Sequence, residues 1–286
     1  MSGESRQPEA GALWREILGR TRCVVVKVGS AVLTSDQGLE AKIVGQLAEQ
    51  IAALQDQGLE VVLVTSGAVA AGRARIRQGE QKKTQGIDFA ELTTRQAASS
   101  IGQSLLMHAY DAAFARHGKT VAQILLTHED FKSPVRFRNA RNTIRHLLDW
   151  GVIPIVNEND TVAVAELKIG DNDKLASFMV DLVGADLFVN LTSADGVFDK
   201  NPDKHPDAVC VPCIADIETL NTKAMCEGKT SAGSGGMKSK LEAAKHAAQR
   251  GVPTLIVSGK CESALKRIFA GEILGTLVLP CVRTVV

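Results

Sequence analysis

A glycine followed at once by a run of apolar, largely β-branched residues recurs along the chain, each time after a segment with helical periodicity. The runs begin after Gly58, Gly118, Gly151, Gly184 and Gly251. Glycine is favoured just beyond the last turn of a helix, and strands covered by helices on both faces are apolar throughout rather than alternating. The pattern predicts an α/β fold, a three-layer αβα sandwich around a mainly parallel central sheet.

Amphipathic segments between these runs supply the expected helices. From residue 41 to residue 57 the apolar side chains fall on one helical stripe, and residues 95–117 repeat the pattern. We expect the stripe of the second segment to cover the sheet; it consists of Ile101, Leu105, Ala109 and Ala112. Further helices are predicted over residues 139–150, 173–183 and 235–250, and a first strand over residues 22–28.

Charge and hydropathy exclude several classes of protein. With 33 Lys and Arg against 32 Asp and Glu, the formal net charge of +1 gives no overall field that would attract nucleic acid or an anionic membrane. Asp181 and Asp186 break the most apolar region, so it falls short of the ~18 residues that a membrane-spanning helix needs. The N-terminal segment has early acidic residues and no apolar core, unlike a targeting peptide. We therefore expect a cytoplasmic protein that binds neither nucleic acid nor membrane.

Neither cysteine nor histidine chemistry stands out. The 6 cysteines are too few for a secreted disulfide framework, and most lie in apolar surroundings, which predicts reduced residues of the core. Cys210 and Cys213 form a CxxC pair, but no second pair or HxxxH segment completes four zinc ligands. The 6 histidines form no common cluster and are expected at the surface or with hydrogen-bond partners. We therefore predict no metal site built from protein ligands.

Polar residues at the ends of the apolar runs are better candidates for a functional site. Lys27 interrupts the first run, and a buried lysine is costly unless it meets an anion. The turn TSGA, from Thr65, follows the second run, although a tight strand-to-helix connection explains it equally well. The polar segment NENDTVA, from Asn157, follows another run and is itself followed by GDND. Ligands of open α/β sheets gather at the C-terminal ends of strands, so these segments point to one site.

A glycine-rich run near the C-terminus is a candidate anion site. GSGGMKSK begins at Gly233 and leads into a predicted helix that contains Lys238 and Lys240. Backbone N–H groups at a helix start, together with a nearby ammonium, can bind phosphate. A flexible loop that caps a surface helix explains the same glycines. The run matches neither the Rossmann GxGxxG pattern nor the Walker pattern.

Together these motifs resemble the amino-acid kinase family. The resemblance covers about residues 22–280 and rests on VVKVGSAVLT, VTSGAVAAG, RQAASSIGQ, QILLT, FRNARNT, GVIPIVNENDTVA, GDND, GADLFVNLT and GSGGMKSK. The GGMxxK segment is common to several branches of the family, whereas NENDTVA with GDND and TSGA is similar to the branch that phosphorylates glutamate. The resemblance implies the amino-acid kinase fold, with an N-terminal extension over 1–21, a substrate lobe over about 22–185 and an ATP lobe over about 186–280.

The resemblance also implies a reaction, the ATP-dependent phosphorylation of the side-chain carboxylate of L-glutamate to L-glutamyl 5-phosphate, the first step of proline biosynthesis. A carboxylate with a pKa of about 4.3 is already ionised at neutral pH, so the nucleophile needs no general base. The reaction instead needs charge neutralisation and alignment of two anions. That need accounts for lysines and N–H donors in the motifs and for the lack of a catalytic histidine.

Site residues are implied where this chain matches the family motifs. The implied catalytic residues are Lys27, Asp173 and Lys240. The implied glutamate-binding residues are Ser66, Asp160 and Asn172. The implied ATP-binding residues, with Mg²⁺ carried by the ATP phosphates, are Lys27, Thr192, Ser193, Ser234, Gly235, Gly236, Met237, Lys238, Ser239 and Lys240.

Partners and alternatives complete these expectations. The resemblance implies a homo-oligomer, dimer or tetramer, and feedback inhibition by proline. Many relatives continue into a small RNA-binding-like domain of the PUA type, which we expect to be absent from this chain. One alternative is a family member that acts on a phosphate or carbamate substrate, favoured if NENDTVA faces solvent. The other is a non-catalytic nucleotide or amino-acid sensor, favoured if one of the charged residues Lys27, Asp173 and Lys240 is lost.

Overall fold

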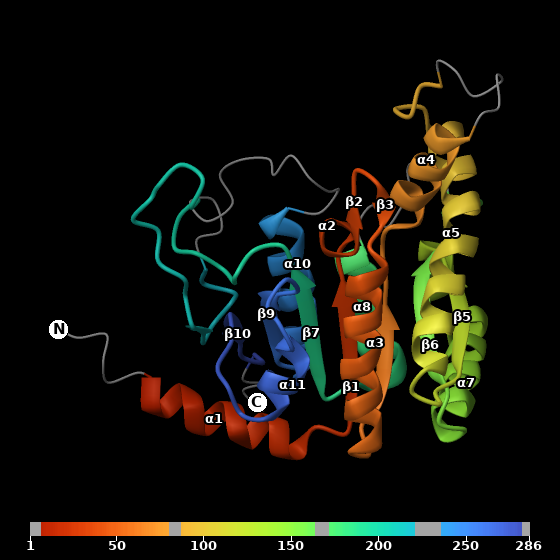
Figure 1. Ribbon diagram of the computed structural model, residues 1–286. Helices are drawn as coiled ribbons and strands as arrows, with labels where there is room; N and C mark the ends of the chain where they lie inside the picture. Colours follow the sequence, from red (N-terminus) through yellow and green to blue (C-terminus); the bar gives the residue numbers. More distant parts are fainter. Residues whose placement is uncertain (1–6, 80–86, 164–171, 221–235, 282–286) are drawn as a thin grey trace.

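A sheet of 8 strands runs through the centre of the computed structural model, which describes residues 7–79, 87–163, 172–220 and 236–281 (Figure 1). The strand order is β5-β6-β4-β1-β7-β9-β10-β8, and the neighbours are parallel except for the antiparallel pair β9 and β10. A separate hairpin joins β2 and β3. The strands are β1 (Cys23–Val28), β2 (Thr34–Ser35), β3 (Gly38–Leu39), β4 (Glu60–Val64), β5 (Val121–Leu126), β6 (Ile153–Glu158), β7 (Leu187–Thr192), β8 (Cys213–Ile214), β9 (Thr254–Ser258) and β10 (Thr276–Val278).

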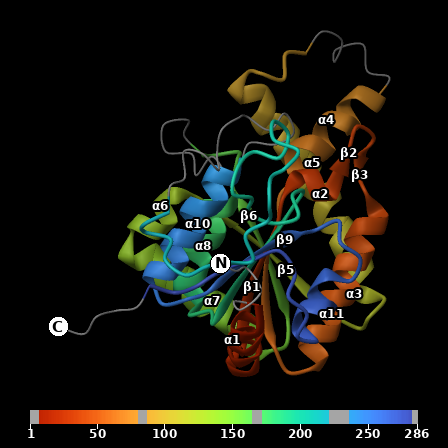
Figure 2. The same cartoon turned by 90° about the vertical axis from the view of Figure 1, so that its left-hand side faces the viewer.

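Helices cover both faces of this sheet. One core cluster lies between the sheet and a layer that includes α3, α5 and α11, and a second lies between the sheet and α7, α8 and α10 (Figure 2). The predicted three-layer αβα sandwich is confirmed. The helices are α1 (Gln7–Arg20), α2 (Ser30–Leu33), α3 (Ala41–Asp56), α4 (Ala68–Gln78), α5 (Leu92–Ala115), α6 (His128–Lys132), α7 (Pro134–Asp149), α8 (Asn172–Val183), α10 (Met237–Gln249) and α11 (Ala264–Phe269).

Strand β1 shows why the apolar runs are continuous. Val24, Val26 and Val28 face one core cluster, whereas Cys23 and Val25 face the other. Successive residues of a strand point to opposite faces, so a strand with helices on both sides needs apolar residues at nearly every position. The one polar residue in β1, Lys27, therefore has a special partner, described below.

The segment before β1 forms part of the folded core. Helix α1 lies across the lower end of the sheet in Figure 1, and Trp14 of α1 is only 2% exposed, within the same core cluster as β1. An aromatic side chain buries a large apolar area, so this contact ties the helix to the domain. The predicted N-terminal extension thus includes a helix that packs on the core of the sheet.

Helix α5 buries a different face from the one predicted. Ile101 and Leu105 are 42% and 38% exposed, and Ala112 is exposed as well. The buried stripe instead contains Ala98, Gly102, Leu106, Tyr110 and Phe114. The prediction was wrong because α5 packs against α4 as well as the sheet, and the close helix contact requires the small residues Ala98 and Gly102 to face inward.

Glycines make that helix contact possible. A Cβ on Gly102 would lie 1.7 Å from the carbonyl oxygen of Ala68, and one on Gly72 would lie 1.8 Å from the carbonyl oxygen of Ala98. The backbones of α4 and α5 therefore touch, and Ala68 begins α4 directly after the TSGA turn. The contact fixes α5 against a segment of the predicted substrate site.

Gly102→Ala is expected to lower the free energy of unfolding by about 1–3 kcal/mol, since the added methyl must force the two helices apart. Gly45→Ala is the control, because a Cβ at this position in α3 meets no atom within 4 Å. There the change should stabilise the helix by up to about 1 kcal/mol. Urea unfolding of both variants measures the difference. Equal stability of the two variants would contradict the close contact.

The cysteines are free but less buried than predicted. Cys23 is buried, whereas Cys210, Cys213, Cys261 and Cys281 are only partly buried, and the sixth cysteine lies outside the described residues. Of the CxxC pair, Cys213 lies in a strand and Cys210 does not, because β8 is short and lies at the edge of the sheet. Within the described segments, no helix combines the length and apolar character that crossing a bilayer requires.

Candidate active site

The candidate site lies at the C-terminal ends of the central strands. Strand β1 pairs with β4 on one side and with β7 on the other, so the chain leaves β1 at a point where the strand order changes direction. Such switch points open a crevice for ligands in parallel sheets. Lys27 and Asn190 lie just before the ends of β1 and β7, and Thr65 directly follows the end of β4.

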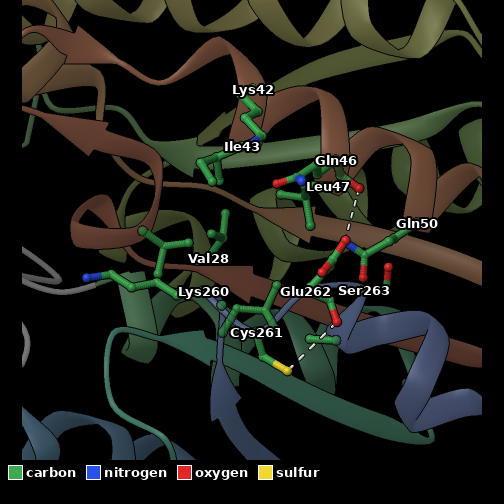
Figure 3. Close-up of a pocket in the computed structure, with 14 residues that line it drawn as sticks. Val28, Lys42, Ile43, Gln46, Leu47, Gln50, Lys260, Cys261, Glu262 and Ser263 are labelled. Atoms are coloured by element: carbon green, nitrogen blue, oxygen red, sulfur yellow. Dashed lines mark hydrogen bonds between the residues drawn. The ribbon is translucent and has the colours of Figure 1, made fainter.

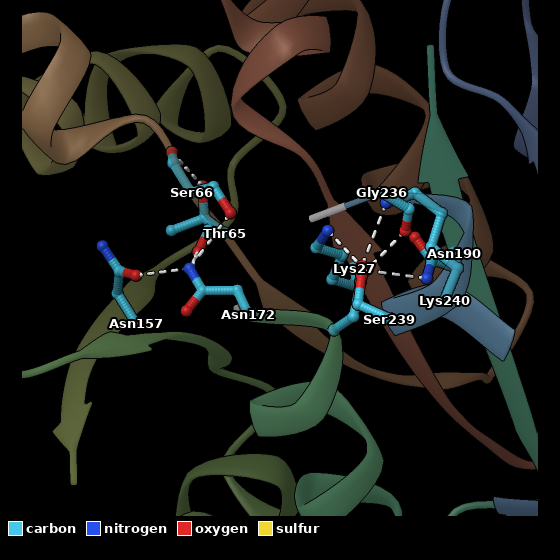
Figure 4. Close-up of polar contacts among 10 residues, drawn as sticks. Lys27, Thr65, Ser66, Asn157, Asn172, Asn190, Gly236, Ser239 and Lys240 are labelled. Atoms are coloured by element: carbon cyan, nitrogen blue, oxygen red, sulfur yellow. Dashed lines mark hydrogen bonds and ion pairs between the residues drawn. The ribbon is translucent and has the colours of Figure 1, made fainter. Parts of the chain in front are cut away.

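A buried carboxylate between two ammonium groups forms the charged half of the site. The Oδ1 atom of Asp173 lies 2.5 Å from Lys27 Nζ, and its Oδ2 atom lies 3.0 Å from Lys240 Nζ. The side chain of Asp173 is completely buried, and those of Lys27 and Lys240 are 3% and 8% exposed. The structure therefore brings together the predicted catalytic residues from β1, α8 and α10 (Figure 4).

Neighbouring groups fix the Asp173 carboxylate further. Asn190 Nδ2 donates a 2.9 Å hydrogen bond to Oδ1, and the Ser239 hydroxyl lies 2.9 Å from Oδ2 and 2.9 Å from the Gly236 carbonyl oxygen. Burial by itself would raise the pKa of Asp173, but the ammonium groups of Lys27 and Lys240 hold that pKa well below its ordinary value. Asp173 is ionised at neutral pH and carries one negative charge between two positive ones.

A cluster of amide and hydroxyl groups forms the second half of the site. It is centred on Asn172, the residue before Asp173. Asn172 Nδ2 lies 2.5 Å from the Thr65 carbonyl oxygen, 3.0 Å from Ser66 Oγ and 2.8 Å from Asn157 Oδ1 (Figure 4). Asn157 is 3% exposed and Glu158 is 6% exposed. The predicted residues Ser66 and Asn172 are therefore in contact, and the start of NENDTVA does not face solvent.

Asp160 lies on the same loop, beyond the end of β6. Its Oδ2 atom accepts a 2.8 Å hydrogen bond from Ser99 Oγ of α5, and its side chain is partly exposed. Gly170 and Asp171 of the GDND segment lie outside the described residues.

The predicted nucleotide-binding residues are only partly described. Thr192 ends β7 with 4% exposure and Ser193 is exposed. Gly236 stands at the start of α10, and its neighbour Met237 packs on the core. Lys238 points outward, with a side chain 74% exposed and 3.8 Å from Glu242. Ser234 and Gly235 lie outside the described residues.

A pocket of about 330 Å³ opens between α3 and the segment after β9 (Figure 3). Val28 and Leu191, the sequence neighbours of Lys27 and Thr192, form part of its wall. Because adjacent strand residues point to opposite faces, the sheet separates this pocket from Lys27. No described residue of the predicted site lines it.

Sequence reasoning missed several polar contacts of the site. Asn190 interrupts the apolar run of β7 just as Lys27 interrupts that of β1, so the same signal could have identified it. Ser99 and Gln103 of α5 gave no such signal, because polar residues are ordinary on an amphipathic helix.

Two histidines also differ from the prediction. His128 and His246 both pack against Phe178, with ring centroids 5.9 and 5.2 Å away, and the Nδ1 atom of each is buried without a hydrogen-bond partner. They thus share a cluster, which the prediction excluded. Burial lowers the pKa of each ring, which favours the neutral form.

Among the described residues, no group of three or more His, Cys, Asp and Glu side chains is placed to hold a metal ion.

Two buried ammonium groups at the C-terminal edge of a parallel sheet suit a phosphoryl-transfer enzyme, which must stabilise the negative charge of the transferring group. The model of the amino acid kinase family matches residues 22–258, and the chain belongs to that family. Its sequence is 56% identical over 268 residues to the glutamate 5-kinase of Nitratidesulfovibrio vulgaris (strain DP4), covering 94% of this chain and 69% of that protein. It is 54% identical over 265 residues to the glutamate 5-kinase of Maridesulfovibrio salexigens, covering 93% and 68%.

Solved structures support the same fold at much lower sequence identity. The UMP kinase of Bacillus anthracis superposes with a TM-score of 0.62 at 17% identity, covering 91% of this chain and 96% of that one. The isopentenyl phosphate kinase of T. acidophilum gives 0.60 at 15% identity, covering 90% and 99%. The amino-acid kinase fold expected from the sequence motifs is therefore confirmed.

Proposed function

We propose that this protein is a glutamate 5-kinase, which transfers the γ-phosphoryl group of ATP to the side-chain carboxylate of L-glutamate in the first step of proline biosynthesis. The observation that carries the proposal is the pair of buried ammonium groups held by Asp173 beside the Asn172 and Ser66 cluster. The similarity to glutamate 5-kinases over most of the chain supports this choice of substrate.

The charged half of the site suits the chemistry of two reacting anions. The glutamate carboxylate is ionised at neutral pH, so nothing needs to remove a proton before it attacks phosphorus. Lys27 and Lys240 would offset the negative charge of the transferring phosphoryl group, and Asp173 keeps both ammonium groups in place beforehand. Catalysis would then consist of alignment and charge stabilisation, as in other phosphoryl transfers.

ATP would bind to the C-terminal lobe, over about residues 186–280. The residues proposed to hold it are Thr192, Ser193 and the segment from Ser234 to Lys240, whose backbone N–H groups at the start of α10 suit phosphate. Mg²⁺ would enter with the nucleotide, because this ion is usually held by phosphate oxygens, waters and few protein carboxylates. Both oxygens of Asp173 are already paired with lysines, which fits an ion carried mainly by ATP rather than by the protein.

The alternatives weighed from the sequence are less well supported. A phosphate or carbamate substrate would be favoured by a solvent-facing NENDTVA segment, but Asn157 and Glu158 are buried. A sensor without activity would be expected to lack part of the charged group, but Lys27, Asp173 and Lys240 are in contact. Assembly as a dimer or tetramer and inhibition by proline are proposed on the family resemblance alone.

Asp160→Ala should raise the KM for glutamate by about ten- to a hundredfold and leave the KM for ATP nearly unchanged. We propose that the Asp160 carboxylate pairs with the α-ammonium of glutamate, and a charge-assisted hydrogen bond contributes about 1.5–3 kcal/mol. Trapping the acyl phosphate with hydroxylamine gives a direct readout. Asp111→Ala, at an exposed position of α5, is the control. An equal loss of affinity for ATP and glutamate would remove Asp160 from the substrate site.

The same pairing predicts that N-acetylglutamate is a poor substrate, because its nitrogen carries no charge to meet Asp160. The hydroxamate assay with glutamate, aspartate and N-acetylglutamate side by side tests this selectivity. Phosphorylation of N-acetylglutamate as readily as glutamate would contradict the proposed function.

A further inference from the structure

Helix α5 contacts the loop that is proposed to bind glutamate. Ser99 Oγ donates a 2.8 Å hydrogen bond to Oδ2 of Asp160, although 61 residues separate them in the chain. Ser99 is 4% exposed, so little water competes for this contact. The adjacent Ser100 hydroxyl lies 3.0 Å from Thr161 Oγ1, the residue after Asp160.

One turn further along α5, Gln103 contacts the amide cluster. Its Oε1 atom accepts a 2.8 Å hydrogen bond from Asn157 Nδ2, and Asn157 Oδ1 accepts from Asn172 Nδ2 at 2.8 Å. Asn172 Nδ2 in turn lies 3.0 Å from Ser66 Oγ. Each side chain proposed to bind glutamate is therefore connected to α5, either directly or through Asn157.

The position of α5 is itself well defined. Gly102 lies between Ser99 and Gln103 in sequence and brings the α5 backbone against the start of α4, just after Ser66. A side chain held by a helix that is packed this closely has little freedom to move. Groups whose rotamers are locked by such contacts are the ones that fix a binding residue in its productive orientation.

We propose that Ser99 is a positioning residue for glutamate recognition. Its hydroxyl fixes the rotation of the Asp160 carboxylate, so that this group is already oriented when the α-ammonium of the substrate arrives. Orientation before binding raises affinity because less conformational freedom is lost on binding. This inference rests on the proposed function, and it assigns a specific role to a residue of the RQAASSIGQ segment that touches neither reacting group.

Ser99→Ala tests the role directly, since alanine removes the hydroxyl and keeps a good helix former. We expect the KM for glutamate to rise roughly five- to tenfold, the scale of one ordinary hydrogen bond, because Ser99 acts on the substrate only through Asp160. The kcat and the KM for ATP should change by less than about twofold. Ser104→Ala, at an exposed position on the same helix, should match the wild type in all three constants. Thermal unfolding of each variant confirms that the proteins compared are folded.

A double-mutant cycle with Asp160→Ala separates positioning from a general structural effect. If Ser99 acts through Asp160, Ser99→Ala should cause almost no further rise in the KM for glutamate once Asp160 is alanine. An equal rise in both backgrounds, a wild-type KM for Ser99→Ala, or a matching rise in the KM for ATP would each overturn the inference.

Failure of the proposed function would look different. In that case the wild-type protein would form no glutamate-dependent hydroxamate, and the inference would be overturned with it. A wild-type enzyme that is active on glutamate, together with a Ser99→Ala variant of unchanged KM, would overturn the inference alone.

Discussion

Lys240→Ala is expected to lower kcat by about 10²–10³-fold while the KM for glutamate changes little, the loss typical of removing one preorganised charge-stabilising group. The Lys240 ammonium is almost fully buried and is held 3.0 Å from Asp173, so its charge is not screened by water. Such a charge is most valuable where negative charge builds up, as the phosphoryl group leaves ADP. Lys27→Ala should behave similarly, because Lys27 contacts the other oxygen of Asp173. Steady-state kinetics with the hydroxamate readout measures both constants.

Lys245→Ala is the matched control for this experiment. Lys245 lies on the same helix as Lys240, but its side chain is 42% exposed and pairs with Glu218 at the surface. A surface ion pair contributes only about 0–1 kcal/mol, so activity should stay near the wild-type level. If Lys240→Ala weakened ATP binding but left kcat unchanged, Lys240 would be a nucleotide anchor rather than a catalytic residue.

Asp173→Asn is expected to abolish nearly all activity and to lower the free energy of unfolding by about 3–5 kcal/mol, the usual cost of removing one partner of a buried ion pair. Asparagine has nearly the same shape but no charge, so two buried ammonium groups would lose their counterion. Urea unfolding at neutral pH measures the loss. The control is Asp181→Asn on the same helix, because Asp181 is 44% exposed and its pair with Arg250 contributes little.

The stability difference between the wild type and Asp173→Asn should depend on pH in a defined direction. The folded-state pKa of Asp173 lies below its unfolded-state value, so the stabilisation by this carboxylate is complete above the unfolded pKa. The difference should therefore be constant from neutral pH down to about pH 4 and narrow only as the pH falls further towards the folded-state pKa. A difference that already disappears near pH 6 would show that Asp173 does not carry the buried charge.

The two lysines of the charged half of the site were accessible from local features of the sequence. Lys27 is a charge inside an apolar strand, and Lys240 follows a glycine-rich helix start. Such exceptions are costly unless a partner exists, so they indicate function even when the partner is unknown. The match with known family motifs then supplied Asp173 as that partner.

The arrangement around helix α5 was not accessible in this way. The sequence shows one apolar stripe through Ile101 and Leu105, but the helix turns a second stripe, which contains Gly102, inward because Gly102 packs against Ala68. Periodicity shows which face of a helix carries the apolar residues, whereas the face that is buried depends on the elements against which the helix packs. The hydrogen bonds of Ser99 and Gln103 depend on that rotation, so no local pattern predicts them.

The sequence by itself determined the layered α/β fold, the family and the charged residues of the site. The fold and Lys27 follow from local signals, namely continuous apolar strands, glycine at helix ends, and a charge where burial would otherwise be unfavourable. The family and Asp173 follow from motifs shared with known proteins. Only the tertiary structure decided which face of α5 is buried and which side chains orient Asp160 and Asn157. These contacts join residues 61 and 54 positions apart, and their geometry is set by the packing of α5 on α4 and the sheet rather than by any local preference.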